Sequence, residues 1–190
     1  MSSDKGICLS GGAAGADITW GTAATKAGYD CLHFTFIGHK TEAPKEQIVI
    51  LSDEQLSEAD YYLAIANKTL RRKWPVENPH VKKLLQRNYY QINSSDSLYA
   101  VASFDKNGQV VGGTAWAVQM KIDRTHNTNM CFIFDQDSSQ WFQWNSTTST
   151  FLVIRTEEVP VPQGIWAGIG SRKLQMCGWD AIQEIFNRAV

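Results

Sequence analysis

The sequence predicts an α/β fold: a three-layer Rossmann-like sandwich around a mainly parallel sheet, built by a single domain over residues 1–190. The first observation behind this prediction is that short apolar runs alternate at least three times with segments of helical periodicity. The second is that glycine turns after residues 9, 111 and 169 each follow an apolar run and precede a helix-like segment. We therefore expect three units of strand, glycine turn and helix, with other strands and helices between them.

The first half of the chain is expected to contain three strands and three helices. Consecutive apolar residues predict strands that are buried on both faces, and apolar side chains at helical spacing predict the helices. Ser52 supplies a helix N-cap, and Trp74-Pro75 and Asn78-Pro79 interrupt the helical pattern. In order, we expect a strand at residues 6–9, a helix at 14–27, strands at 30–36 and 48–51, a helix from Ser52 to about 70 and a helix at 79–90.

The second half is expected to repeat this alternation. A strand at residues 98–104 is followed by a turn signal at 105–108, the apolar pair Val110-Val111, the second glycine turn and a helix-like segment at 115–120. Residues 130–134 predict another buried strand, 151–154 an edge strand and 157–162 an extended connector. A strand at 165–169 then leads through the third glycine turn into a helix at about 176–189.

The amino-acid composition restricts the molecules and the compartment with which we expect the chain to be associated. A net charge of −1 and a pI near 6.4 exclude the basic stripe of a duplex-DNA reader. The only local cluster, Arg71-Arg72-Lys73, is interpreted as a solvated helix end, with a phosphate clamp for single-stranded nucleic acid as the alternative. No apolar run approaches the ~20 residues that span a bilayer. The scattered Cys8, Cys31, Cys131 and Cys177 indicate reduced thiols and a cytoplasmic location.

The glycine turns predict a phosphate-binding site. Parallel strands end at one edge of their sheet, so the three turns can present helix N-termini to one ligand there. Arg172 is a candidate phosphate partner, with a surface ion pair as the alternative, and Asp17 accepts from a ribose hydroxyl or caps its own helix. Trp141 or Trp144 stacks a base or packs in the core. The chain has neither GxxxxGK[ST] nor GxGxxG with a following acidic residue, which disfavours kinase-like and dehydrogenase functions.

With these residues in view, the chain resembles the SLOG superfamily of Rossmann-like nucleotide-binding domains, near the branch related to the DNA-processing protein A. The matching segments are residues 10–17, 83–88, 112–115 and 168–172. In that family the unit that matches Gly168-Ile169-Gly170-Ser171-Arg172 comes first, whereas here it closes the chain. The resemblance therefore implies a circular permutation, which joined termini in a compact domain allow.

The resemblance implies binding of a nucleotide or a nucleotide-derived signalling molecule. Similar phosphoribohydrolases carry a glutamate three positions beyond the turn threonine. Ala117 stands there in this chain, so hydrolysis of a nucleotide N-glycosidic bond is the alternative function, with Asp17 as its candidate catalytic residue. We expect no cofactor and no metal, since the histidines share no ligand spacing, and leave a homodimer open. The expected ligand-binding residues are Ser10, Gly11, Gly12, Ala13, Gly15, Asp17, Arg87, Asn88, Gly112, Gly113, Thr114, Gly170, Ser171 and Arg172.

Overall fold

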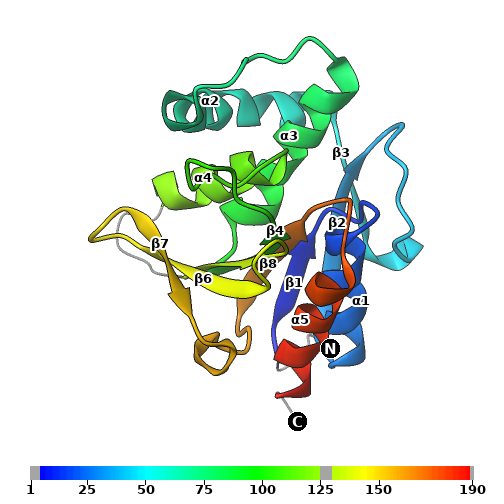
Figure 1. Ribbon diagram of the computed structural model, residues 1–190. Helices are drawn as coiled ribbons and strands as arrows, with labels where there is room; N and C mark the ends of the chain where they lie inside the picture. Colours follow the sequence, from blue (N-terminus) through cyan, green and yellow to red (C-terminus); the bar gives the residue numbers. More distant parts are fainter. Residues whose placement is uncertain (1–4, 125–129, 189–190) are drawn as a thin grey trace.

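The computed structural model describes residues 5–124 and 130–188, whose strands form one eight-stranded sheet in the order β3-β2-β1-β8-β4-β5-β6-β7 (Figure 1). The strands are β1 (Ile7–Ser10), β2 (Asp30–Phe36), β3 (Ile48–Leu51), β4 (Ser97–Ala102), β5 (Cys131–Asp135), β6 (Gln140–Asn145), β7 (Thr150–Ile154) and β8 (Ile165–Gly170). The helices are α1 (Ala16–Lys26), α2 (Asp53–Leu70), α3 (Pro79–Asn93), α4 (Thr114–Arg124) and α5 (Met176–Asn187), and the 3-10 turns are η1 (Lys45–Gln47) and η2 (Thr156–Glu158).

The sheet is parallel from β3 to β5, and β6 and β7 extend it as an antiparallel pair. β8, the last strand in the chain, lies between β1 and β4, with Gly170 opposite Val101 of β4. The carboxyl ends of β1, β8 and β4 therefore meet at one edge of the sheet. Open α/β sheets bind their ligands outside that edge.

Helices cover both faces of the sheet (Figure 1): α1 and α5 pack together on one face, and α2, α3 and α4 on the other. β4 shows why the sheet needs both layers. Leu98 and Ala100 join the core under α2, α3 and α4, while Tyr99 and Val101 join the core under α1 and α5. A strand buried on both faces carries consecutive apolar residues. The predicted three-layer α/β fold with a mainly parallel sheet is confirmed.

Local signals placed most helix boundaries well. The Ser52 hydroxyl accepts from the Gln55 N–H at 3.2 Å, and the Gln55 side chain accepts from the Ser52 N–H, so α2 begins at the predicted cap as a capping box. Asn78 is the N-cap of α3, and its side chain accepts from two backbone N–H groups of the first turn. β7 lies at the outer edge of the sheet, as predicted for residues 151–154.

One expected unit was wrong. Val110-Val111 does not form a strand of the sheet; Val110 pairs only with Phe104, in a short hairpin between β4 and α4. The predicted turn at residues 105–108 closes this hairpin, with the Asp105 carboxylate accepting from two backbone N–H groups. Two apolar residues are too few to compete for a sheet position that β8 occupies through pairing with both β1 and β4. Residues 5–124 and 130–188 thus contain two direct units of strand, glycine turn and helix.

Cysteine pairing and helix length were the two compositional features that the structure describes. Cys8, Cys31 and Cys131 are buried, Cys177 is half-buried, and none of these four described residues forms a disulfide. In residues 5–124 and 130–188, no helix combines the length and apolar character that crossing a bilayer requires.

Candidate functional site

The turn between β1 and α1, residues 11–15, lies directly against the end of β8. The Ala16 N–H donates to the Ser171 carbonyl at 3.0 Å, and the Gly170 N–H donates to Asp17 Oδ1 at 2.9 Å. A Cβ on Gly15, which has φ of 93°, would stand 2.5 Å from the Ser171 carbonyl oxygen. Glycine is required here because the first and third predicted turns touch.

Residues 11–15, hereafter the glycine turn, present backbone N–H groups to which the described residues offer no hydrogen-bond acceptor. In the part of the chain that the structure describes, none of its N–H groups has a protein hydrogen-bond partner, although Gly11, Gly12 and Ala13 are buried. Buried N–H groups are almost always paired with protein, ordered water or ligand. Gly12 has φ of 59°, and successive N–H groups around a left-handed residue form an anion-binding concavity. The geometry suits an oxyanion.

A buried ion pair lies against this turn. Arg87 on α3 donates through Nη1 to Asp17 Oδ2 at 3.2 Å, and both side chains are 5–7% exposed. A Cβ on Gly11 would stand 1.1 Å from Arg87 Nη1, so the guanidinium occupies the space that the missing side chain leaves. Burial raises the pKa of Asp17 and lowers that of Arg87, and each partner's charge opposes the other's shift. Arg87 Nε remains without a partner among the described residues.

His33, in the middle of β2, supplies a second buried atom without a partner among the described residues. Its ring is 1% exposed, Nε2 lies 3.3 Å from Cys31 Sγ, and Nδ1 has no hydrogen-bond partner in the described residues. The hydrogen bond from Cys8, and then contact with His33, lower the pKa of the Cys31 thiol to about 6 although burial opposes this. A Cβ on Gly12 would stand 3.3 Å from His33 Nδ1, so this atom borders the glycine turn.

The segment after β2 covers the glycine turn from the other side. Thr41 Oγ1 donates to the Gly12 carbonyl at 2.8 Å. His39 Nδ1 and the Thr35 hydroxyl share a hydrogen bond of 2.8 Å. The His39 ring stacks on Phe36, and the Phe36 ring also contacts His80 of α3. Burial, and then the charge of Arg87, lower the pKa of His39 to about 4. Of the basic side chains described here, the Arg87 guanidinium and the His33 ring border the turn itself, and the guanidinium favours an anion there.

The second predicted turn meets α3. The Asn88 side chain donates to the Gly113 carbonyl at 3.3 Å, and Thr114 begins α4. Gly112 and Gly113 are exposed. Arg72 donates to the carbonyls of Gly112 and Val110 at 2.7 and 2.9 Å, and Lys73 pairs with Glu77. These contacts agree with a solvated helix end at residues 71–73, since the Arg72 guanidinium binds the chain's own backbone.

Other predicted residues have structural contacts of their own. The fully buried Ser10 hydroxyl lies 2.7–2.8 Å from the carbonyls of Gly168 and Asp17, so it joins β1 to β8 and α1. Asp17 accepts from Gly170, Arg87 and, at 3.4 Å, Gln91, in addition to lying in the first turn of α1. Arg172 is exposed on the segment that touches Gly15.

Sequence reasoning missed two features of this site. It treated His33 only as a histidine without metal spacing. It recognised residues 38–42 as a polar loop at the carboxyl edge of the sheet but included none of them among the expected ligand-binding residues. The available signal was the position of Thr41, which follows the predicted strand at residues 30–36, whereas His33 lies inside that strand. Within residues 5–124 and 130–188, no three His, Cys, Asp or Glu side chains gather in an arrangement that could hold a metal ion.

Comparison with known proteins supports the α/β fold and does not identify a ligand. No protein-family model and no curated protein matches the chain. The structure is similar to that of a protein from Syntrophus aciditrophicus SB named "Putative molybdenum carrier protein", with a TM-score of 0.56 and 13% sequence identity. The match covers 98% of this chain and 96% of the other. The two proteins share an α/β fold over nearly their whole lengths.

Proposed function

We propose that the chain binds a nucleotide or a nucleotide-derived signalling molecule at the carboxyl edge of the sheet, with a phosphate group on the glycine turn. The observation that carries this proposal is the set of unpaired N–H groups at residues 11–15, of which three residues are buried. A phosphate oxygen would satisfy donors that otherwise cost free energy in the folded state. The positive end of the α1 dipole adds to this preference.

The side chains around the turn support an oxyanion independently of the backbone. Arg87 Nε and His33 Nδ1 are buried atoms without partners among the described residues, and the Arg87 guanidinium and His33 Nδ1 border the turn at Gly11 and Gly12. Arg172 is exposed and its backbone lies beside Gly15, which supports its proposed role as a phosphate partner from the solvent side. In this proposal Asn88 and the turn at residues 112–114 form the more distant wall, where the sugar or a second phosphate lies.

The SLOG-like interpretation, including the circular permutation, belongs to this proposal. It is supported by the place of β8, which pairs in parallel with β1, and by the packing of α5 on α1. If α5 led directly into β1, residues 165–187 would form the first strand and helix of a conventionally ordered Rossmann-like chain. The turn of that unit, residues 170–172, would then stand beside the glycine turn as the family pattern requires.

A bare oxyanion is the second candidate ligand. The protein with the similar fold is named as a molybdenum carrier, and molybdate and phosphate are both tetrahedral oxyanions. The donors at the glycine turn recognise such an anion without needing a sugar or a base. Trp141, one of the two proposed base-stacking residues, is 1% exposed and packs on Phe134 in the core.

Hydrolysis has less support than binding. The Asp17 carboxylate accepts from three protein donors and pairs with a buried arginine, which leaves it poorly placed to act as a free acid or base. Ala117, at the position of the family's glutamate, is fully buried. Asp123, the next carboxylate along α4, accepts from Gln119 at 2.8 Å.

The test is calorimetric titration of the wild-type chain with AMP, ADP-ribose, a cyclic dinucleotide, inorganic phosphate and molybdate. Two variants carry the site: Gly12→Ala, whose Cβ would point at Thr41 Oγ1 from 2.4 Å and fill the turn, and Arg172→Gln. Their matched controls are Gly38→Ala, a glycine with φ of 90° and open space around it, and Lys173→Gln, the neighbouring exposed cation. Circular dichroism verifies that each variant folds.

We expect nucleotide binding that weakens at least tenfold in Gly12→Ala and several-fold in Arg172→Gln, while both controls bind as wild type. Phosphate or molybdate binding as tightly as AMP would select the bare-oxyanion function instead. Absence of binding across the panel, or Gly12→Ala binding like Gly38→Ala, would refute the site. Chromatography of the AMP samples for free adenine tests the hydrolytic alternative.

A further inference from the structure

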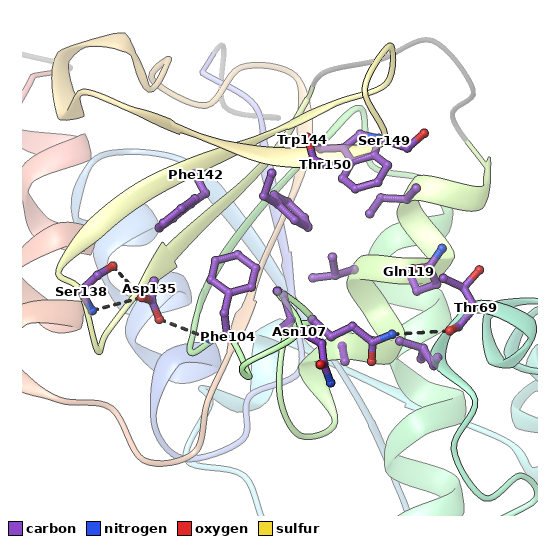
Figure 2. A pocket seen from close by; sticks show the side chains of 18 residues that line it. Thr69, Phe104, Asn107, Gln119, Asp135, Ser138, Phe142, Trp144, Ser149 and Thr150 are labelled. Atoms are coloured by element: carbon purple, nitrogen blue, oxygen red, sulfur yellow. Dashed lines mark hydrogen bonds between the residues drawn. The ribbon is translucent and has the colours of Figure 1, made fainter.

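A cavity of about 510 Å³ lies apart from the glycine turn, on the α2, α3 and α4 side of the sheet (Figure 2). Its wall comes from the end of α2, the hairpin at residues 104–110, the inner side of α4 and the β6–β7 pair. It shares no lining residue with residues 10–17 or 170–172. This volume is in the range of small-molecule sites in proteins, ~300–1,000 Å³.

Aromatic rings form one side of the cavity. The ring centroid of Phe104 lies 5.0 Å from that of Phe142 and 5.3 Å from that of Phe151. The ring centroids of Trp144 and Phe151 are 5.1 Å apart, and the interplanar angles of the three pairs are between 53° and 68°. Figure 2 shows the side chains of Phe104, Phe142 and Trp144 across the space from Gln119 of α4. Tilted rings of this kind offer both edges and faces to an inserted aromatic ring, the arrangement that aromatic pairs prefer.

The opposite side is aliphatic with a few polar groups. Ala115, Val118 and Ile122 lie on one side of α4 at spacings of three and four residues and line the cavity together with Gln119 and Asn107. The Gln119 Nε2 group donates to Asp123 at 2.8 Å, which orients this amide at the wall. Amide groups beside apolar surface fix the orientation of a ligand that carries one hydrogen-bonding group.

Charge decides which ligand fits. The lining that the structure describes contains no Lys, Arg or His, and its one ionisable residue is Asp135. That carboxylate is 6% exposed and accepts from the Phe104 N–H at 3.3 Å and from the N–H and hydroxyl of Ser138 at 3.1 and 2.6 Å. An anion would enter an apolar space beside a buried carboxylate with no cation to compensate. The cavity therefore disfavours the phosphate-bearing molecules that suit the glycine turn.

We propose that this cavity is a second binding site, for an uncharged aromatic molecule of one or two fused rings that stacks among Phe104, Phe142, Trp144 and Phe151. The ring system lies between these side chains and the aliphatic side of α4, and a single polar substituent reaches Gln119 or Asn107. This inference does not depend on the proposed function of the glycine turn.

The experiment compares two ligands that share one ring system and differ in charge. Wild-type chain is titrated with 3-methylindole and with indole-3-acetate, with calorimetry for affinity and amide and methyl chemical shifts for location. Thr150→Trp places a bulky ring at the cavity wall. Thr148→Trp is the matched control, because Thr148 and Thr150 are both exposed, their hydroxyls share one hydrogen bond at 2.8 Å, and only Thr150 lines the cavity.

We expect 3-methylindole to bind at least tenfold more tightly than indole-3-acetate and to shift the Val118 and Ile122 methyl and Gln119 side-chain signals. Thr150→Trp weakens this binding at least tenfold, and Thr148→Trp and Gly12→Ala leave it unchanged. The proposal is overturned if neither ligand binds, if the anion binds as well, if both tryptophan variants lose binding alike, or if the shifted signals lie elsewhere. Signals from wild type decide the location even if a variant misfolds.

Discussion

The buried Asp17–Arg87 pair gives the sharpest prediction about how the site is held. It joins α1 to α3 across 70 residues of sequence, and its side chains are 5% and 7% exposed. Removing one member of such a pair leaves the other charged, buried and uncompensated, which costs ~3–5 kcal/mol of unfolding free energy. We expect Arg87→Met and Asp17→Asn each to cost an amount in this range.

The double variant Asp17→Asn/Arg87→Met distinguishes a buried charge pair from two independent packing contacts. Replacing both members leaves no uncompensated charge, so its cost is expected to be well below the sum of the single costs. With an m-value of ~2 kcal/mol/M in urea, a single substitution lowers the urea midpoint by ~1.5–2.5 M. Equilibrium urea unfolding followed by circular dichroism measures all three variants.

Lys82→Met supplies the control on the same helix. Lys82 pairs with Asp60 at 2.8 Å, but the two side chains are 33% and 38% exposed. Solvent-screened pairs contribute ~0–1 kcal/mol, so the midpoint is expected to move by less than ~0.5 M. Equal midpoints for Arg87→Met and Lys82→Met, or single costs that simply add in the double variant, would refute the reasoning.

Two further predictions test packing and pH dependence. Gly168→Ala would place a Cβ 2.6 Å from the Trp20 Cβ in the core. We therefore expect the free energy of unfolding to fall by ~1–3 kcal/mol and the melting temperature to fall by roughly 2–12 °C. A Cβ on Gly113 would have no atom closer than 3.6 Å, so Gly113→Ala is expected to melt near wild type. The pKa of His39 falls from 6.5 to about 4 on folding, so the unfolded state binds more protons between these values; stability is full above pH 6.5 and declines toward pH 4. Urea midpoints across this range should lose part of their slope in His39→Gln, and an unchanged slope would contradict the assignment.

Local signals were enough to predict the fold. Runs such as Leu98 to Ala102 identify a strand buried on both faces because every consecutive side chain enters one core or the other. Ser52 identifies the start of α2 because capping is a contact between near neighbours. The strand predicted at Val110-Val111 was wrong because its outcome depended on β8, whose residues lie more than 50 positions away and take the place beside β4.

The site could be predicted only in part, for the same reason. Backbone donors are encoded locally, so the glycine turn was visible as Gly11, Gly12 and Gly15 in sequence. The side chains that complete it come from other elements, Arg87 from α3 and His33 from the middle of β2. Each is brought there by packing between segments that are distant in sequence. Arg87 entered the prediction through family resemblance, and His33 did not enter it.

The contrast between the two proposed sites follows from where each lies on the sheet. Residues 11–15 stand at the ends of parallel strands, where a helix begins and backbone N–H groups are left over, so the binding capacity there is polar and anionic ligands gain from it. The cavity lies where β6 and β7 extend the sheet past α4, and Phe142, Trp144 and Phe151 stay half-buried. Apolar strands that the described helices cover only in part leave hydrophobic surface, which an uncharged ring covers at no electrostatic cost. Substitutions at one site should therefore leave ligand binding at the other intact.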